Sequence, residues 1–425
     1  MRVLVIGVSG LIGSAIASRL SADGHQVTGV ARHPDRLPGV TCIAMDISQT
    51  NPGSWQPLLE TIDAVINCAG TLQDSPTEST EGIHVHGIAA LYEACARANV
   101  RRVIHFSALG ADRQASPFGR SKLRGEQELM KRPLDWIILR PSVVIGRSAY
   151  GGSALLRGLA ALPLLPVMPR TAELQPILLD DVVEVVIALL KPDAPTRQMI
   201  ELVGPRRYRF DELVGVFRQW MRWPPAASFA VPDGLAHIAY RLGDMAAWLG
   251  WKPALRTTAE REMQFGAVGD PAQLQSAASI KARSLEASMA REPASVQERW
   301  FARLFLLKAL IFGVFGAFWI ATGLISLGPG WEIGTAYVRE GGLSQTMAAA
   351  ATIAGALSDI VIGLAILYRP TTRYGLYAAL LISVTYAIIG TILVPRLWID
   401  PLGPMLKIWP VMMLNLVALA IVDDR

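Results

Sequence analysis

The most constraining feature of the chain is a short apolar run, residues 2–6, followed at once by three evenly spaced glycines. The run predicts a buried parallel strand, and residues 14–20 predict a helix. Between such elements glycine permits backbone angles that other residues avoid, lets a pyrophosphate approach the main chain, and lets the helix pack close to the sheet. The helix N-terminus adds N–H groups that favour phosphates. The predicted dinucleotide site comprises Gly7, Ser9, Gly10, Leu11, Ile12 and Gly13.

Short apolar runs and helical patterns then alternate as far as about residue 145. The further runs have the length and composition of buried strands and lie at 26–31, 40–45, 64–69, 102–107 and 136–141. The helical patterns between them lie at 57–62, 84–98 and 121–131. This alternation predicts an α/β fold with a doubly wound parallel sheet, in which a ligand binds at the carboxyl ends of the strands.

The pattern is less regular between about residue 146 and residue 265, where prolines interrupt it repeatedly. This stretch predicts a small substrate-side subdomain that covers the crevice, so the first domain is expected to occupy residues 1–265. Residues 266–298 are mostly polar and rich in Ala, Ser and Gln, and they predict a linker. At its end, Ser295 and Glu298 have the spacing of a capping box, which predicts the start of a helix.

The last third of the chain is far more apolar, and 52% of all 425 residues are hydrophobic. Uncharged stretches cover residues 309–331, 341–358, 374–395 and 408–422. About 20 apolar residues span a bilayer, and the last stretch reaches that length if Lys407 extends to the interface. Residues 299–425 therefore predict an all-α four-helix transmembrane bundle, with spans at about 304–327, 345–368, 373–394 and 402–422.

Lysine and arginine are distributed unevenly between the two ends of these spans. On the side of the first domain lie Arg299, Arg303, Lys308, Arg369 and Arg373. On the other side lie Arg339 and Arg396. Basic residues near spans stay on the cytoplasmic side, and the first residues lack the pattern of a signal peptide. We expect an integral, multi-pass protein of the cytoplasmic membrane, with the N-terminal domain and both termini cytoplasmic.

Other classes of partner find no support in the sequence. Cys42, Cys68 and Cys95 form no CxxC pair, and the histidines form no HExxH motif, so no metal site is expected. The formal net charge is only +5, and basic runs with interleaved aromatic residues are absent from the sequence. Nucleic acid is therefore not an expected partner.

Further motifs follow the glycines in the order found in one enzyme superfamily. They are Asn67-Cys-Ala-Gly70, Phe106-Ser107-Ala-Leu-Gly110, Lys122, Leu139-Arg-Pro-Ser142 and Pro176-Ile-Leu-Leu-Asp-Asp-Val182. With these motifs and the spacing of Gly7, Gly10 and Gly13, residues 1–265 resemble the short-chain dehydrogenase/reductase superfamily, in its extended or atypical branch.

The resemblance implies roles for individual residues. Asp46 and Ile47, after the third strand, would border the adenine. The adenosine and ribose side would be lined by Cys68, Ala69 and Gly70. Lys122 would bind the nicotinamide ribose, and Ser107 would polarise a substrate carbonyl.

Arg32 bears on the choice between the two nicotinamide cofactors. The second strand ends at Ala31-Arg32 without an acidic residue. An acid at this place would bind a ribose 2′-hydroxyl, whereas arginine suits a 2′-phosphate. We therefore expect NADP(H) rather than NAD(H), the alternative being that Arg32 is an ordinary surface arginine.

One departure from the superfamily concerns catalysis. The usual Tyr-x-x-x-Lys pair is replaced by Phe118 and Lys122, and phenylalanine cannot transfer a proton. Ser121 and Tyr150 are possible substitutes. His84 stands where extended members usually carry asparagine, so it is either a proton relay or an ordinary helix-face histidine. Catalytic roles for Ser107 and Lys122 are therefore only tentative.

The last 125 residues resemble the DoxX-like family of four-helix membrane proteins, which implies association with redox or quinone-linked membrane proteins. Asp359 is an acid inside a predicted span, and Asn415 lies in the fourth span. A charge at such depth is costly, so Asp359 should face the bundle interior. These residues either make structural hydrogen bonds within the bundle or form a functional site for a proton or a ligand.

Two functions remain open on this evidence. The first is a membrane-anchored NAD(P)(H)-dependent oxidoreductase that acts on a hydrophobic or quinone-like substrate delivered at the bilayer. The second is a catalytically weak or inactive nucleotide-binding sensor or accessory subunit that docks to a membrane redox protein. Phe118 is the residue that separates them.

Overall fold

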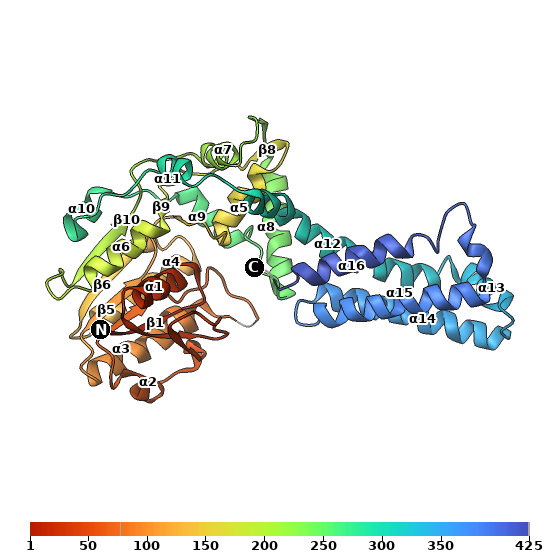
Figure 1. Ribbon diagram of the computed structural model, residues 1–425, viewed down its shortest axis with the longest axis horizontal. Helices are drawn as coiled ribbons and strands as arrows, with labels where there is room; N and C mark the ends of the chain where they lie inside the picture. The colour runs from red at the N-terminus through yellow and green to blue at the C-terminus, as the bar shows by residue number, and fades with distance from the viewer. Residues whose placement is uncertain (77, 424–425) are drawn as a thin grey trace. The chain divides into compact units, whose positions relative to one another are not determined.

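The computed structural model describes residues 1–76 and 78–423, which form two compact units. The first unit comprises Met1–Met245 and Pro253–Ala302, and the second comprises Ala246–Lys252 and the chain from Arg303 onward. Figure 1 shows the parallel sheet and its covering helices in the first unit and the long helices of the second.

A parallel sheet forms the centre of the first unit. Within the described residues it has seven strands, β1 (Arg2–Ile6), β2 (Gln26–Ala31), β3 (Val40–Ala44), β4 (Ala64–Asn67), β5 (Arg102–Phe106), β6 (Asp135–Pro141) and β10 (Gln198–Leu202). Their order is β10-β6-β5-β4-β1-β2-β3, so the direction of winding reverses between β4 and β1. Such a reversal opens a crevice at the carboxyl ends of the strands.

The register of the strands brings their carboxyl ends to one edge. Ile6 pairs with Val30 on one side and with Asn67 on the other, and Asn67 pairs with His105. The segments that follow β1, β2, β4 and β5 therefore emerge together, which places distant sequence motifs around one crevice.

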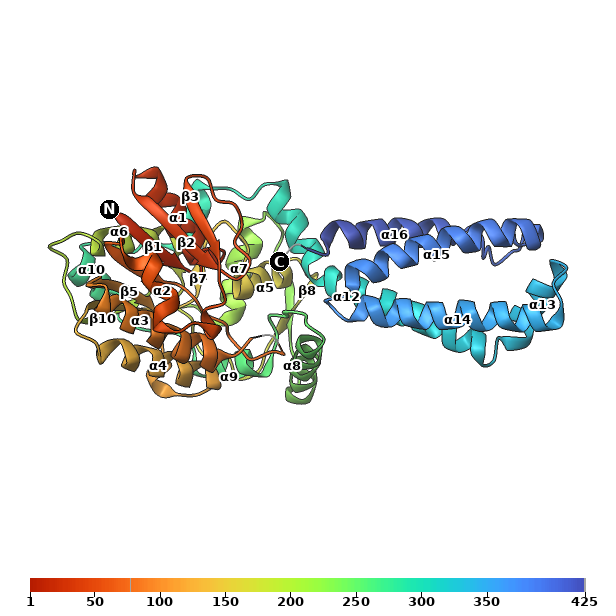
Figure 2. The ribbon, with the colours of Figure 1, turned by 90° about the horizontal axis from the view of Figure 1, so that it is seen from below.

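Helices cover both faces of the sheet, as Figure 2 shows. One face packs against α1 (Leu11–Ala22), α6 (Leu179–Leu189) and α10 (Ala272–Ala278). The other packs against α2 (Pro52–Leu59), α3 (Ile88–Arg97) and α4 (Pro117–Met130). Alternate residues of β1 enter the two cores, which explains why this strand reads as a continuous apolar run.

The predicted strands agree with the structure to within two residues, whereas helix starts differ more. The helix predicted at 57–62 is α2, which begins at Pro52 because the Asn51 side chain caps it by accepting from Ser54 N at 3.1 Å. The pattern at 84–98 divides into a π-helix, η2 (Gly82–Gly87), and α3. Ser116 caps α4, so that helix begins four residues before the predicted Ser121.

Besides α6 and β10, which join the central sheet and its cover, the predicted subdomain contains short paired strands and four helices within the described residues. The strands pair as β7 (Val144–Ile145) with β9 (Ile177–Leu178), and β8 (Leu164–Val167) with β11 (Ala227–Ala230). The helices are α5 (Gly151–Ala160), α7 (Phe210–Trp220), α8 (Asp233–Trp248) and α9 (Thr257–Phe265). Single-turn helices η1 (Ile47–Gln49) and η3 (Ala111–Arg113) lie in the loops after β3 and β5.

Residues 266–298, predicted as a linker, instead pack onto the first unit. They contain α10 and α11 (Leu285–Arg291), and Leu274 is fully buried in the sheet core. Arg283 fixes the segment to α6, because its Nε donates to Asp181 Oδ1 at 2.6 Å. Only a few apolar residues of this segment are buried and the rest are mostly polar, which explains why its composition resembles that of a linker.

The second unit consists of long apolar helices. Its elements in the described part of the chain are α12 (Val296–Leu327), α13 (Trp331–Glu340), α14 (Gln345–Leu367), α15 (Thr372–Leu393), η4 (Pro395–Trp398) and α16 (Ile408–Ile421). The predicted capping box forms at the start of α12, where Ser295 N donates to Glu298 Oε2 at 2.8 Å. Helix α13 was not predicted, because it is short and its charged residues Glu332, Arg339 and Glu340 place it outside the uncharged stretches.

Among residues 1–76 and 78–423, the helices α12, α14 and α15 are long and apolar enough to cross a membrane. Helix α16 has 14 residues and begins at Ile408, whereas the predicted fourth span begins at 402. Pro401, Gly403 and Pro404 account for the late start, since proline and glycine disfavour a helix interior. The chain nevertheless returns along α15, because Met405 packs at Gly390 and Asn415 bonds to Leu376 O.

Candidate functional site

The glycine turn between β1 and α1 has the geometry that its sequence predicts. Gly7 has φ +79°, and a Cβ there would lie 2.9 Å from Ala69 N, in the loop after β4. A Cβ on Gly13 would lie 2.3 Å from Gly7 O. Any side chain at either position would force the turn, the first helix and the β4 loop apart, so the glycines are required for this close packing.

This turn supplies a cradle that fits the pyrophosphate of a dinucleotide. Gly10 is the N-cap residue of α1, and Leu11 and Ile12 are the first helical residues, with Ser9 just before the cap. The backbone N–H groups of a first helical turn are not used within the helix, and the helix dipole makes this end positive. Glycines at 7 and 10 keep the approach to the main chain free of Cβ atoms.

Arg32 follows β2 directly and reaches the loop after β4. Its guanidinium forms an ion pair with Glu78, whose side chain is 8% exposed, while that of Arg32 is 36% exposed. Glu78 also accepts a hydrogen bond at 2.9 Å from the hydroxyl of Thr71. The residue predicted to meet a 2′-phosphate therefore has a carboxylate as its partner here.

Asp46 and Ile47 follow β3 at the same edge of the sheet. Asp46 caps η1 by accepting from Ser48 N at 3.0 Å and from the Ser48 hydroxyl at 2.8 Å. Ile47 is 7% exposed and packs into the core against α2 and α3. The role of these two residues at the adenine remains a prediction.

The Lys122 side chain connects the end of β5 to the loop that follows β4. Its Nζ donates to Phe106 O at 2.9 Å and to Ala69 O at 3.4 Å. Burial lowers the pKa of Lys122 to about 8. A Cβ on Gly70 would lie 3.1 Å from this nitrogen, so the glycine lets the main chain pass directly over it. Burial also raises the pKa of the neighbouring Cys68 thiol, so that thiol stays protonated.

Ser107 lies at the end of β5, next to the carbonyl that holds Lys122. Its backbone N–H donates to Leu139 O at 2.8 Å, which fixes its position against β6. Its hydroxyl is buried and has no hydrogen-bond partner among the described residues. A buried hydroxyl without a partner is costly, so this one is suited to bind a polar atom of a ligand.

Phe118 occupies the place of the usual tyrosine, and its surroundings form a closed network. Its ring meets that of His84 edge-on, with centroids 5.7 Å apart. Thr71 N donates to His84 Nε2 at 3.1 Å, which leaves the proton on Nδ1. His84 Nδ1 lies 2.8 Å from Ser121 Oγ, and that hydroxyl donates to Phe118 O at 2.9 Å.

This network bears on the two interpretations of His84 and favours the structural one. Burial and the nearby Lys122 hold the pKa of His84 well below its usual range, so the ring is neutral. Both ring nitrogens and the Ser121 hydroxyl already have partners. His84 and Ser121 therefore act as a structural clamp between η2 and α4. Tyr150, the other substitute considered for the tyrosine, lies just before α5 with 37% of its surface exposed.

Sequence patterns gave no sign of a second buried network below the site. Asn67 Nδ2 donates to the Tyr92 hydroxyl and to His105 Nδ1, each at 3.1 Å, and Asn67 Oδ1 accepts from Ala69 N at 3.1 Å. On α4, Glu126 binds Arg140 of β6 through two hydrogen bonds of 2.8 and 2.6 Å. These contacts hold the β4 loop and α4 in place around Lys122.

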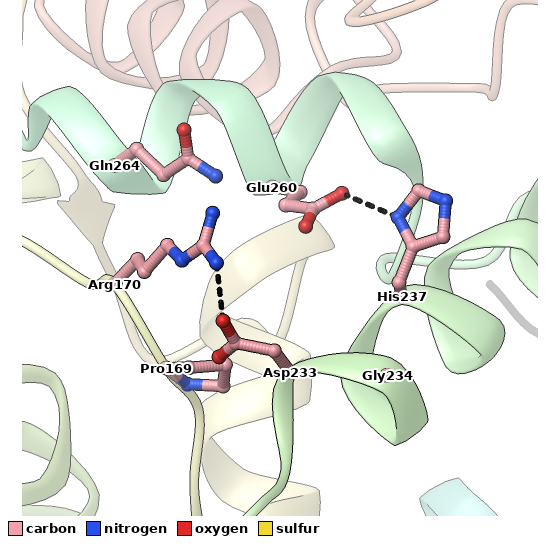
Figure 3. A pocket seen from close by; sticks show the side chains of 7 residues that line it. All are labelled: Pro169, Arg170, Asp233, Gly234, His237, Glu260 and Gln264. Carbon is pink, nitrogen blue, oxygen red and sulfur yellow. Dashed lines mark hydrogen bonds and ion pairs between the residues drawn. The ribbon is translucent and has the colours of Figure 1, made fainter.

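A separate cavity of about 330 Å³ lies in the subdomain, as Figure 3 shows. Asp233 and His237 of α8 face Arg170 and Glu260 across it, and His237 Nδ1 lies 3.7 Å from Glu260 Oε2. Helix α9, which carries Glu260, is tied to the N-terminus of α4 by a hydrogen bond from Ser116 to Glu262. The cavity is therefore connected through α9 to the helix of Phe118 and Lys122.

The second unit places its two predicted polar residues in separate surroundings. Asp359 is 3% exposed and accepts a hydrogen bond at 2.9 Å from the hydroxyl of Tyr386 on α15, a partner that the sequence did not indicate. Asn415 donates to Leu376 O at 3.1 Å. Leu376 follows Gly375, which packs against Ala365 of α14, so Asn415 lies at the level of Ala365. Ala365 is six residues after Asp359 on the same helix, a distance of ~9 Å along the helix axis. Each of the two residues therefore has its own hydrogen-bond partner, and a functional role for them remains a prediction.

Two protein families match separate parts of the chain. Residues 7–157 match the family described as NAD(P)H-binding, and residues 316–416 match the DoxX-like family. The fold and the glycine turn thus agree with an NAD(P)-binding domain of the Rossmann type. In this chain that domain is followed by a DoxX-like domain with apolar, membrane-type helices, which confirms the predicted fusion.

Curated relatives match about half of the chain. The chain is 28% identical over 49% of its length to the 40 kDa subunit of NADH-ubiquinone oxidoreductase from Neurospora crassa, and covers 57% of that protein. It is 27% identical over 50% of its length to the photosystem II assembly factor Ycf39 of Synechocystis, covering 66% of it. An uncharacterized protein of Mycobacterium tuberculosis is 27% identical over 49% of this chain, which spans only 22% of that relative.

Solved structures agree on the fold. MoeE5 in complex with UDP-glucose and NAD matches with a TM-score of 0.55 and 20% identity, covering 72% of this chain and all of that one. The Bordetella bronchiseptica enzyme WbmG in complex with NAD matches with a TM-score of 0.53 and 17% identity, covering 68% of this chain and 92% of that one.

Proposed function

We propose that the protein is a membrane-bound reductase that uses NADP(H) in preference to NAD(H) and reduces a quinone-like acceptor. The observation that carries the proposal is the arrangement at Lys122. Its buried ammonium group, with a pKa of about 8, and the Ser107 hydroxyl, which has no partner among the residues that the structure describes, flank the position of Phe118, which has no hydroxyl. A nicotinamide bound over this site would supply the hydride.

The missing hydroxyl limits the kind of acceptor. A ketone becomes an alkoxide when it accepts hydride, and such an anion is about as basic as hydroxide, because water ionises near pKa 15.7. A quinone becomes a phenolate, whose parent phenol ionises near pKa ~10. The second anion is far more stable, so its formation does not depend on a proton donor placed in direct contact.

Lys122 and Ser107 are suited to stabilise and protonate the anion that forms when a quinone accepts hydride. The Ser107 hydroxyl can donate a hydrogen bond to the reduced oxygen. Lys122 is held by Phe106 O and Ala69 O, and near neutral pH it can release one proton to the acceptor anion. The cofactor's hydride and this proton together complete the two-electron reduction to a quinol.

The test is turnover by the full chain in lipid nanodiscs. We expect oxidation of NADPH with a short-chain quinone, little oxidation with simple ketones, and a loss of about 10²–10⁴ in kcat for Lys122→Met. Arg120→Ala is the matched control, since Arg120 is an exposed cation on the same helix. Tight NADPH binding without turnover of any quinone would contradict a reductase.

A second function is favoured by the closed network at His84, Ser121 and Phe118. In this alternative the nucleotide is a bound signal or structural element, and the DoxX-like domain docks to a membrane redox protein. Relatives named as a respiratory complex subunit and a photosystem assembly factor support it. Phe118→Tyr separates the two functions when quinones and ketones are both assayed: a wild type that reduces neither, with reduction appearing only in this variant, would indicate a binding protein whose catalytic hydroxyl has been lost.

We also propose that the second unit crosses the cytoplasmic membrane four times with the first unit in the cytoplasm. The basic residues near α12 and between α14 and α15 support this orientation, although Asp423 pairs with Arg369 and Arg373. A cysteine replacing the 77% exposed Leu402 should react with an impermeant maleimide in intact cells, whereas Cys42 should react only after lysis. The reverse pattern would overturn the topology.

A further inference from the structure

Helix α8 exposes a continuous apolar stripe. Leu235, Ile238, Leu242 and Met245 are 55–61% exposed. At about 100° per residue these four positions fall within roughly 80° of the helix circumference. Single exposed apolar residues are ordinary, but a full-length stripe on one helix face marks an interaction surface.

The opposite face of α8 packs against the protein and fixes the direction of the stripe. Ala236, Tyr240 and Ala247 are nearly fully buried there. A Cβ on Gly243 would lie 1.7 Å from Leu255 O, so the helix and the following segment are in the closest possible contact. The stripe therefore cannot turn inward without dismantling this packing.

The end of α8 leads into the membrane unit. The segment Ala246–Lys252 belongs to that unit, where Trp251 Nε1 donates to Leu367 O at 2.7 Å and Leu249 O accepts from Arg369 N at 2.9 Å. Leu367 is the last residue of α14. The segment is thus attached where an apolar membrane helix ends, which is the depth of the lipid headgroups.

We propose that α8 lies in the membrane interface with its stripe in the lipid. Continuity with the headgroup level at Trp251 selects lipid over a second copy or another protein as the occupant. The 74% exposed Trp248 and the Arg369 guanidinium, which lies 5.5 Å from the Trp251 ring centroid, are residue types that occupy this layer. Helices with an apolar face, flanking charges and tryptophan bind membranes in this way.

The proposal gives the subdomain a position and is independent of which reaction the site performs. Asp244 of α8 accepts a hydrogen bond at 2.9 Å from Gln73, in the loop that covers Lys122. The first turn of α8 lines the subdomain cavity (Figure 3). A lipid-bound α8 would therefore hold both the cavity and the nucleotide loop next to the bilayer, where a membrane-dissolved molecule can reach them.

Spin labels test the proposal on the full chain in nanodiscs of phosphatidylcholine and phosphatidylglycerol. Single cysteines at Ile238 and Leu242 are compared with matched exposed positions on the same helix, His237 and Arg241, after Cys42, Cys68 and Cys95 are replaced by alanine. A cooperative thermal unfolding transition checks that each labelled protein is folded. The readout is the accessibility of each label to oxygen, which concentrates in lipid, against a water-soluble nickel chelate.

We expect a several-fold higher ratio of oxygen to nickel accessibility at 238 and 242 than at 237 and 241. Equal, water-like ratios at all four positions would overturn the proposal. Labels at 238 and 242 that are shielded from both reagents would also overturn it, because they would place a protein surface over the stripe.

Discussion

The two halves of the nucleotide site are built in opposite ways. The turn at Gly7, Gly10 and Gly13 is defined by main-chain geometry, in which any added Cβ meets another backbone segment. The half around Lys122 is defined by side chains. There Phe118, His84 and Ser121 contact one another, while the Ser107 hydroxyl has no hydrogen-bond partner in the described part of the chain.

The difference teaches that nucleotide binding and proton transfer are separable within one fold. Backbone cradles tolerate almost no change, since their function is their shape. Side chains at a strand end can be exchanged while the fold persists, provided that the new groups satisfy one another's hydrogen bonds.

The largest effect should come from breaking the binding half. Gly13→Ala places a methyl group 2.3 Å from Gly7 O, so we expect loss of NADPH binding by at least 100-fold or loss of folding. Gly215→Ala on α7 adds the same methyl group where nothing lies within 4 Å. Isothermal titration with NADPH compares the two variants. Equal affinities would show that the turn adapts and that the backbone argument is wrong.

The pH profile probes the chemical half. The reductive step needs protonated Lys122, whose pKa is lowered to about 8 by burial. Quinone reduction should therefore be constant below this pH and fall about tenfold per unit above it. Initial rates at saturating NADPH between pH 6 and ~10 measure this. A flat profile would remove Lys122 as the proton source.

A smaller effect, on the preference for NADPH over NADH, is expected from Arg32 at the edge of the binding half. Arg32→Ala should weaken NADPH by about tenfold with little change for NADH, since a charged hydrogen bond contributes roughly 1.5–3 kcal/mol and Arg32 is partly exposed. Glu78→Gln should tighten NADPH, because it releases the guanidinium from its carboxylate partner. Fluorescence titrations with both nucleotides give the ratio, and an unchanged ratio in both variants would exclude Arg32 as the selector.

The smallest effect, on stability rather than on nucleotide binding, should come from the structural clamp formed by His84 and Ser121. Ser121→Ala leaves the buried Nδ1–H of His84 without its acceptor, which costs about 1–3 kcal/mol. We expect a lower melting temperature with unchanged NADPH affinity. Ser276→Ala, at an exposed serine of α10 that bonds only within its helix, is the control. A loss of turnover without a loss of stability would restore Ser121 as a proton-transfer group.

Local sequence rules predicted what depends on local geometry. Strand β1, the glycines and α1 follow from a stretch of twenty residues, and the parallel sheet follows from repeated alternation. The roles of Lys122 and Ser107 came from the resemblance to the short-chain dehydrogenase/reductase superfamily and not from a local rule, since Lys122 lies within helix α4. The fusion to a membrane unit follows from uncharged length alone.

Long-range pairing could not be predicted in this way. The partners Glu78 for Arg32, Ser121 for His84 and Tyr386 for Asp359 depend on how helices and loops pack in three dimensions. The burial of Leu274 was missed for the same reason, because one apolar residue among polar neighbours carries no periodicity. The exposed apolar face of α8 becomes visible only when the packed face of the helix is known.

The packing of residues 266–302 onto the sheet has a consequence for synthesis. Leu274 fills the core beside α6, and Arg283 pairs with Asp181, so the first unit is complete only after these late residues have left the ribosome. The next residues to emerge are the apolar turns of α12. Domains fold as units during translation. The first unit therefore completes its core at the same stage of translation at which the first apolar membrane-type helix emerges. Folding of the first unit and membrane insertion of the second are thereby coupled.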